Sequence, residues 1–448
     1  MPFSYNPPTR STCSVCEQLE RIDNREPVIK TINGKASDAN GYPFHGWYNF
    51  VLGFTPTFPE YILKTMEITA DDIVLDPFNG SGTTQLVCKL QGIQSIGVDA
   101  NDFMVYAANE KLNWNHDAFL LERALNIIIE EYERQAARIN FNDTAIVKEI
   151  AMSLRPEMLD KRYMSDKPLI KIFTLKQAIE DALEADGVKS FFSFALASIL
   201  VSVSNIKYGP GFGIGKLKED VDVPKLYREK IDKMISDLKS VTRQQVDTES
   251  TTIMGDARRL SEFIDEETIS LIVTSPPYPG DHEYTKHSRI ELIFSGMATD
   301  LVSFRKIKKR MLRASTTNIY KDDNDCAAVI NLESIIEVTK QIDERLKNDG
   351  ATSGFEKLYT KLVWEYFGGM SKTFDECLKI LRPGGKIALL VSDSHAFKMV
   401  HIQTAQILSQ IGQMAGFVNP EIDLWQMKNS TSHKYRLREN ILIMQKPF

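Results

Sequence analysis

The stretch that decides the fold is Ile73-Val74-Leu75-Asp76-Pro77-Phe78-Asn79-Gly80-Ser81-Gly82-Thr83-Thr84. Its first three residues form a short apolar run, which predicts a buried β-strand that ends at Asp76. A turn with two glycines follows, and residues 84–90 then continue in a helical pattern. The order of strand, tight turn and helix is typical of the start of a doubly wound α/β sheet.

A second strand follows at the spacing of one βαβ unit. Gly92 ends the predicted helix, and the next apolar run, residues 95–99, ends at Asp99. A carboxylate at that strand end can accept hydrogen bonds from both hydroxyls of a ribose. Gly80 and Gly82 allow a sharp turn and a close approach of the backbone to a ligand. The pattern therefore predicts a nucleotide-like cofactor, and on these residues alone a dinucleotide fits as well as an adenosyl group.

The remaining strands come much later in the chain. Residues 251–256 predict a third strand, 269–274 a fourth and 386–391 a fifth, and the last residues suit an antiparallel pair. Leu121, Leu125, Ile128 and Tyr132 lie in the long interval before the third strand, and their three- and four-residue spacing predicts helices. We therefore divide the chain into an irregular segment 1–45, a first core part 46–114, a helical insertion 115–245, a second core part 246–280, a second insertion 281–360 and a last core part 361–448.

The composition is that of an ordinary soluble protein. The chain has 448 residues, a net charge of −6 and five cysteines. No apolar run approaches the roughly 18 to 20 residues of a membrane span, and the N-terminus lacks a secretory pattern, so we expect a cytoplasmic protein. Cys13 and Cys16 have half the spacing of a zinc site, but no second pair completes it, so we expect no metal.

A second motif, Thr274-Ser275-Pro276-Pro277-Tyr278, follows the predicted fourth strand. The lone pair of an exocyclic amine on a base is delocalised into the ring, so the amine needs acceptors for its protons before it can attack a methyl group. The Ser275 hydroxyl and the Pro276 carbonyl can supply two such acceptors. The two prolines hold the backbone in a fixed shape. Tyr278 offers a flat face for a base extruded from a duplex.

These two motifs together resemble those of bacterial DNA amino-methyltransferases, which modify cytosine N4 or adenine N6. The serine form of the second motif is similar to that of the cytosine N4 enzymes. The resemblance implies a Rossmann-like methyltransferase fold, S-adenosylmethionine as cofactor, and double-stranded DNA with a flipped target base as substrate. It implies catalytic roles for Ser275, Pro276, Pro277 and Tyr278. The cofactor residues that it implies are Thr55, Pro56, Asp76, Phe78, Gly80, Gly82, Thr83, Asp99 and Asp256.

A basic run lies in the second insertion, close to the catalytic motif. Its cationic residues are candidates for contacts with DNA phosphates, and they are Arg305, Lys306, Lys308, Lys309, Arg310 and Arg313. The stretch 209–216 is rich in glycine, but Pro210 stands where a phosphate-binding loop needs its first glycine and Leu217 where it needs serine or threonine, so we interpret it as a mobile loop at the tip of the helical insertion that could line the substrate cleft. A surface ion pair is the simplest interpretation of Arg289 and Glu291.

Three functions remain open at this point. The first is cytosine N4 methylation of DNA, as in the modification half of a restriction system with a cognate endonuclease. The second keeps the chemistry but changes the substrate to adenine N6 in DNA or to an RNA base. The third is a non-catalytic scaffold that binds cofactor and DNA without turnover. The intact residues 275–278 favour an enzyme, because a scaffold has no need of those acceptors.

Overall fold

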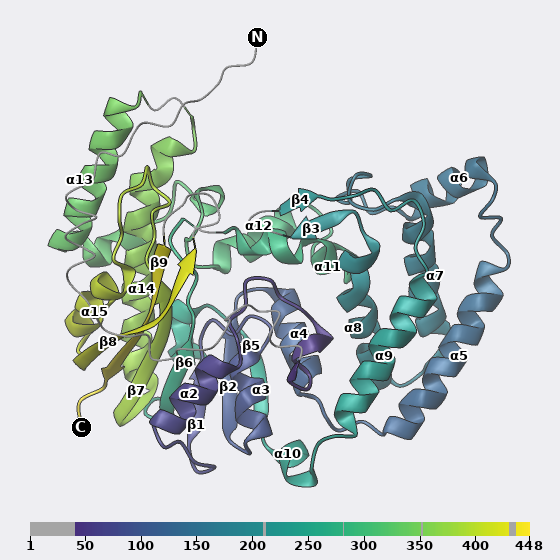
Figure 1. Cartoon of the computed structure of the whole chain (residues 1–448), viewed down its shortest axis with the longest axis horizontal. Coiled ribbons are helices and arrows are strands. Elements are labelled where there is room, and N and C mark those ends of the chain that lie inside the picture. The colour runs from purple at the N-terminus through teal and green to yellow at the C-terminus, as the bar shows by residue number, and fades with distance from the viewer. Residues whose placement is uncertain (1–40, 209–211, 281, 351–352, 430–435) are drawn as a thin grey trace.

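Figure 1 shows the computed structural model of the chain. The structure describes residues 41–208, 212–280, 282–350, 353–429 and 436–448. Cys13 and Cys16 lie outside the described residues, as do most of segment 1–45 and positions 209–211 of the glycine-rich loop.

A seven-stranded sheet forms the centre of the molecule, with the strand order β5-β2-β1-β6-β7-β9-β8. β1, β2, β5, β6 and β7 run parallel, whereas β9 is antiparallel to both β7 and β8. This confirms the predicted Rossmann-like fold and the antiparallel pair at its far edge. The strand bounds are β1 (Ile73–Asp76), β2 (Gln94–Asp99), β5 (Ser250–Met254), β6 (Ile269–Thr274), β7 (Leu381–Ser392), β8 (Val418–Asn429) and β9 (Arg436–Gln445).

Helices cover both faces of the sheet because successive strand residues point to opposite sides. Val74 and Leu271 belong to one buried cluster with residues of α2 and α3. Leu75 and Ile272 belong to another with residues of α13, α14 and α15. The helices of these two layers are α2 (Thr57–Thr65), α3 (Thr83–Leu90), α13 (Glu333–Asn348), α14 (Tyr359–Ile380) and α15 (Thr404–Ala415).

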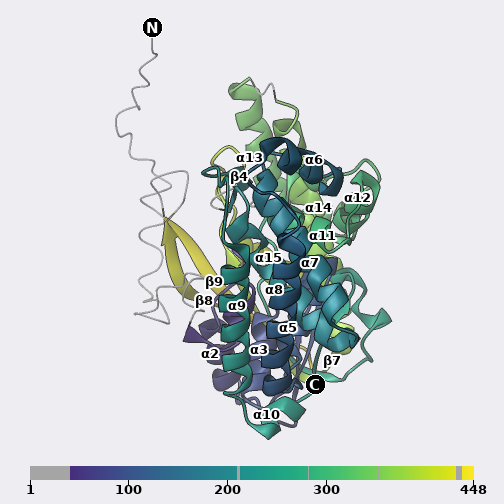
Figure 2. The same cartoon turned by 90° about the vertical axis from the view of Figure 1, so that its right-hand side faces the viewer.

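The interval between β2 and β5 forms a separate helical lobe on the right of Figure 1. Figure 2 shows α5, α8 and α9 packed side by side in this lobe. A short hairpin of β3 (Ile206–Tyr208) and β4 (Phe212–Ile214) follows α8. The helices of the interval are α4 (Asp102–Leu112), α5 (Ala118–Ala136), α6 (Thr144–Leu154), α7 (Asp166–Ala182), α8 (Asp186–Val203), α9 (Val223–Leu238) and α10 (Arg243–Asp247).

The apolar helix α8 corrects one expectation from the sequence. By length and composition it is apolar enough to cross a membrane. In the structure α8 packs against α4, α7 and α9, and its side chains Phe191, Phe192 and Phe194 are fully buried there. Its apolar residues are therefore accounted for by a protein core.

The stretch between β6 and β7 also departs from expectation at its end. Helix α14 begins at Tyr359, and the strand expected at residues 386–391 begins earlier, at Leu381. Gly368 and Gly369 interrupt the apolar pattern because α14 lies against the backbone of residues 325 and 326, where a Cβ at Gly368 would be 2.1 Å from Asp325 O. The other elements here are η4 (Tyr284–Ser288), α11 (Arg289–Phe294), α12 (Leu301–Arg310), η5 (Thr316–Asn318), η6 (Asp325–Val329) and η7 (Glu356–Leu358).

Candidate functional site

The carboxyl ends of the parallel strands meet at one pocket. The chain runs outward from β1 to β2 and β5 on one side, and from β6 to β7 on the other. In open α/β sheets ligands bind at such a switch point, beyond the strand ends. The pocket there is lined by residues after β1, β2, β5 and β6, together with residues 50–55 and parts of β8 and β9.

The loop after β1 is shaped by glycines with backbone conformations that other residues avoid. Gly80 has φ +51° and Gly82 has φ +83°, and Gly82 is the N-cap of α3. A Cβ on Gly82 would lie 3.2 Å from the Ala108 Cβ in α4. The loop carbonyl of Ser81 accepts a hydrogen bond from the buried Lys111 Nζ at 2.7 Å. The loop is therefore held from behind, and its residues 77–81 and 83 line the pocket.

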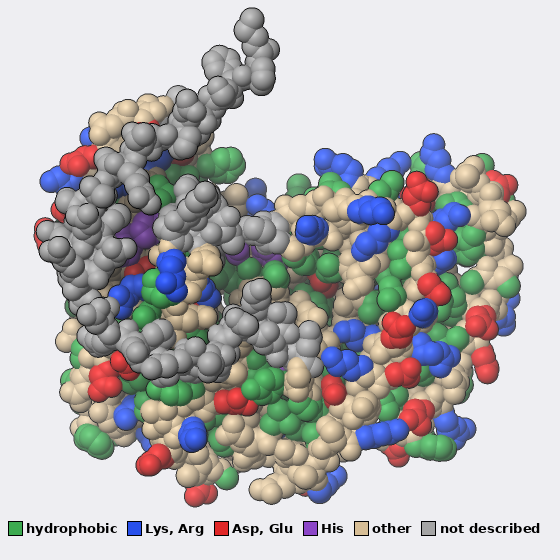
Figure 3. Space-filling view, in the orientation of Figure 1, with side chains coloured by type: hydrophobic (Ala, Val, Ile, Leu, Met, Phe, Trp, Pro, Cys, Tyr) green, Lys and Arg blue, Asp and Glu red, His purple; other side chains and the backbone are tan. Residues whose placement is uncertain are grey.

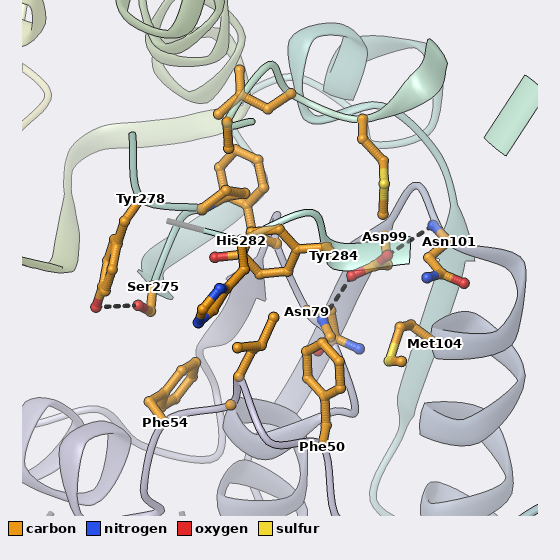
Figure 4. A pocket seen from close by; sticks show the side chains of 18 of the residues that line it. Phe50, Phe54, Asn79, Asp99, Asn101, Met104, Ser275, Tyr278, His282 and Tyr284 are labelled. Carbon is orange, nitrogen blue, oxygen red and sulfur yellow. Dashed lines mark hydrogen bonds between the residues drawn. The ribbon is translucent and has the colours of Figure 1, made fainter. Parts of the chain in front are cut away.

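Asp99 faces the pocket from the end of β2. Its Oδ2 accepts a hydrogen bond from Gly80 N at 2.7 Å, and its Oδ1 accepts one from Asn101 N at 2.8 Å (Figure 4). Burial raises the pKa of Asp99 to about 7, and the nearby Asp76 adds to that shift. A carboxylate has about four lone-pair sites, so acceptor capacity remains for the hydroxyls of a ligand.

Asp256 lies at the end of β5 and also lines the pocket. Its carboxylate forms an ion pair with Arg258, with Nη2 to Oδ2 at 2.6 Å. Arg258 in turn pairs with Asp325 at 2.5 Å. This second carboxylate fixes Arg258, and Arg258 fixes Asp256 at the strand end.

The residues of the catalytic motif lie at the end of β6. Ser275 Oγ lies 3.0 Å from the Tyr278 hydroxyl and donates a hydrogen bond to Leu390 O at 3.0 Å. Figure 4 shows Ser275 and Tyr278 on one side of the pocket and Asp99 on the other. The Ser275 and Tyr278 hydroxyls and the Asp99 carboxylate thus share one pocket.

Two comparisons with known proteins bear on this pocket. A family model described as DNA methylase matches residues 49–110. The chain is 24% identical to the Type II methyltransferase M.BsoBI of Geobacillus stearothermophilus over 96% of this chain and 92% of that protein. These similarities support a DNA amino-methyltransferase family.

Further relatives extend the likeness. Type II methyltransferase M.AvaI of a Nostoc species is 23% identical over 84% of this chain and 79% of that protein. Type II methyltransferase M.MjaII of Methanocaldococcus jannaschii is 30% identical over 33% of this chain and 27% of that protein. The matched family segment, residues 49–110, contains the loop after β1 and Asp99.

Most residues that the resemblance implicates line the pocket. They are Thr55, Phe78, Gly80, Thr83, Asp99, Asp256, Ser275, Pro277 and Tyr278. Arg310, from the basic run, lines it as well. Pro56, Gly82 and Pro276 lie next to lining residues in the chain.

Asp76 has a position different from the one the resemblance implies. It is fully buried beneath the loop, where Oδ1 accepts from Thr274 Oγ1 at 2.5 Å and Oδ2 accepts from Thr84 Oγ1 at 2.8 Å. Burial raises the pKa of Asp76 to about 6. Asp76 therefore joins β1, β6 and α3 and is not among the residues that line the pocket.

The basic run forms most of α12, and its members differ in what they can contact. Lys308 pairs with Glu283 at 3.2 Å, and Lys309 pairs with Asp322 at 3.0 Å. Arg310 forms an ion pair with Asp102.

Arg313 lies just beyond α12. It is 6% exposed and pairs with Asp323 at 2.9 Å, so we remove it from the proposed DNA contacts. Arg305 and Lys306 are exposed and have no ion pair with any residue that the structure describes.

Several pocket residues carried no signal in the sequence. They come from residues 50–53, the segment after the catalytic motif, and β8 and β9, and they include Phe50, His282, Tyr284, Trp425, Gln426, Lys428 and Glu439. Glu291 was interpreted as half of a surface ion pair, which is wrong. Its side chain is fully buried, and Oε1 accepts a hydrogen bond from the Tyr48 hydroxyl at 3.2 Å.

Proposed function

We propose that this chain is a site-specific DNA methyltransferase that transfers a methyl group from S-adenosylmethionine to the exocyclic N4 amine of cytosine. The observation that carries the proposal is the position of Ser275, whose hydroxyl faces the same pocket as the Asp99 carboxylate. Hydroxyl and carbonyl acceptors suit an amine that must shed its conjugation to the ring before it attacks.

The residues of the pocket fit S-adenosylmethionine. Asp99 retains acceptor capacity for the two ribose hydroxyls after its two backbone hydrogen bonds. The positive φ angles of Gly80 and Gly82 bring the backbone close to a ligand. The Phe50 ring, whose Cδ1 lies 3.7 Å from the Cβ position of Gly80, can face a sulfonium cation. Asp256 supplies an acceptor for the adenine amine.

The chemistry that we propose needs no covalent enzyme intermediate. When bound, the cofactor supplies an electrophilic methyl group on its sulfonium sulfur. Ser275 Oγ and Pro276 O accept the two N–H groups of the target amine, so its lone pair turns toward the methyl carbon. The cofactor would supply the methyl group and leave as the thioether, while the amine held by Ser275 and Pro276 would lose one proton to solvent.

The target base must leave the duplex to reach this pocket. Tyr278 supplies an aromatic face at the pocket for a flipped base, and exposed basic side chains nearby suit DNA phosphates. Figure 3 shows Lys and Arg side chains along the upper edge of the helical lobe, around β3 and β4. Lys207 and Lys216 are exposed there, and Arg305 and Lys306 are exposed on α12. We propose that DNA lies along the β3–β4 hairpin and α12.

The same site chemistry suits adenine N6, which remains the second candidate because its amine has the same conjugation. The similarity to Type II methyltransferases favours a cytoplasmic protein that protects DNA from a cognate restriction endonuclease. Methylation-sensitive long-read sequencing of a host that expresses the protein tests both points. We expect N4-methylcytosine at one short recognition sequence. N6-methyladenine at such a sequence would replace the first candidate by the second, and an unmodified genome would contradict both.

A further inference from the structure

A buried carboxylate of the C-terminal hairpin lies against the catalytic motif. Glu439, in β9, is 1% exposed. Its Oε1 lies 3.2 Å from the Tyr278 hydroxyl, which lies 3.0 Å from Ser275 Oγ. The three side chains therefore form a chain of contacts that leads from the predicted amine acceptor to a carboxylate.

Other donors surround the same carboxylate. Gln426 Nε2 donates to Glu439 Oε2 at 2.5 Å, and Lys428 forms an ion pair with Oε1. Both residues belong to β8, and both line the pocket. An ionised carboxylate accepts hydrogen bonds and donates none. Between Glu439 and Tyr278, the phenol hydroxyl is therefore the donor and the carboxylate the acceptor.

This restricts the hydrogen bonds that Ser275 can receive. The Tyr278 hydroxyl has one proton, and when that proton is donated to Glu439 it cannot be donated to Ser275. The Ser275 proton then goes to Leu390 O at 3.0 Å or to the Tyr278 oxygen at 3.0 Å. In both arrangements the proton is taken up by the protein, and the lone pairs of Ser275 Oγ remain for a substrate amine.

The geometry points to Glu439 as a positioning residue that keeps Ser275 an acceptor by receiving the proton of Tyr278. This inference rests on the proposed amine methylation. It gives the buried carboxylate a role beyond its contacts with Gln426 and Lys428, whose donors offset the cost of burial. It also predicts that the effect of Glu439 passes through a single oxygen atom, the phenol oxygen of Tyr278.

The test compares Glu439→Gln, Tyr278→Phe and the double variant in single-turnover methyl transfer. An amide has one acceptor oxygen in place of two, and Lys428 and Gln426 already compete for it. The Tyr278 hydroxyl then donates either to Ser275 Oγ, where its proton competes with the amine, or to Leu390 O, where it displaces the Ser275 proton. We expect the rate of Glu439→Gln to fall by roughly tenfold or more, with cofactor and DNA affinities within about twofold of wild type.

The double variant supplies a readout that a merely structural role would not move. Without the phenol hydroxyl, Glu439 has no route to Ser275, whose proton goes to Leu390 O. We expect Tyr278→Phe to lose less rate than Glu439→Gln, and the double variant to recover to the rate of Tyr278→Phe. If Glu439→Gln loses no rate, or if its loss persists in the Tyr278→Phe background, the proposal is wrong.

Two further variants complete the design. Glu421→Gln removes a charge from an exposed position of β8 and should leave the rate unchanged. If Glu439→Gln does not fold, Glu439→Met removes the acceptor altogether, and the same comparison with Tyr278→Phe applies. An inactive wild-type protein would overturn the proposed function. An active wild type with an insensitive Glu439 would overturn only the positioning role.

Discussion

The backbone amide of Gly80 donates a hydrogen bond to Asp99 Oδ2 at 2.7 Å, so the turn after β1 is tied to the end of β2. The Asp99 carboxylate is therefore both a structural acceptor and the proposed acceptor for the cofactor ribose. Burial raises its pKa to about 7, which makes its charge sensitive to pH near neutrality.

Cofactor affinity should depend on pH through Asp99. Ribose hydroxyls donate to the charged carboxylate, so binding lowers the pKa and releases a proton when the pH is below about 7. Affinity should therefore rise with pH up to about 7 and then level off. Calorimetric titration of the wild type and Asp99→Asn measures this. The variant should bind at least about tenfold more weakly and lack this pH dependence, and an unchanged slope would contradict the assignment.

Gly82→Ala should weaken cofactor binding and lower stability. An alanine there must adopt φ +83° and place its Cβ 3.2 Å from the Ala108 Cβ. The conformation alone costs about 1 to 2 kcal/mol.

The matched control is Gly187→Ala in α8, where the new Cβ meets no atom within 4 Å. It should be neutral or stabilise the helix by up to about 1 kcal/mol. Urea unfolding and cofactor titration check both variants. Equal effects of the two substitutions would rule out a special role for the loop.

The buried Glu291 should make stability depend on pH. Burial raises its pKa to about 8, above the ordinary value of 4.5 that it has in the unfolded chain. Its contribution to stability is therefore full below about pH 4.5 and is lost as the pH rises through about 8.

Glu291→Gln removes the ionisable group but keeps an acceptor for Tyr48. The variant should be more stable than wild type at pH 9, and its free energy of unfolding should change less between pH 6 and pH 9, by roughly 1 to 3 kcal/mol. Urea denaturation at the two pH values gives the comparison. A steeper pH dependence in the variant would show that Glu291 is not the responsible group.

Arg305→Gln with Lys306→Gln should weaken DNA binding and reduce its dependence on salt. If each side chain neutralises one phosphate, the slope of log affinity against log salt should fall by about 0.9 per residue. The control pair, Arg138→Gln with Lys148→Gln, changes exposed residues of the outer helical lobe. Fluorescence anisotropy over a range of salt concentrations measures both pairs. An equal loss in both would show general electrostatics and not a contact surface.

The local pattern of the sequence predicted the core strands well. Residues 269–274 form β6 as predicted, and the loop after β1 lies at the predicted pocket. Short apolar runs and glycine turns are determined by nearby residues, so the sequence reveals them.

The wall of the pocket formed by β8 and β9 could not be predicted because its geometry is non-local. Trp425 lies where the register shifts between Leu424 and Gln426, a bulge with no glycine or proline to mark it. Arg310 forms an ion pair with Asp102, and Glu291 accepts a hydrogen bond from Tyr48. The partners in each pair are far apart in the sequence and meet only in the folded chain. Neither partner could be identified from spacing.

The most direct test of the central claim is mass spectrometry of nucleosides from DNA incubated with the purified protein and cofactor labelled in its methyl group. We predict labelled N4-methylcytosine with the wild type, and a loss of roughly 100-fold or more in rate with Ser275→Ala while cofactor affinity is retained. Labelled N6-methyladenine without N4-methylcytosine would contradict the assignment of the base. An undiminished rate in Ser275→Ala would contradict the assignment of the catalytic acceptor.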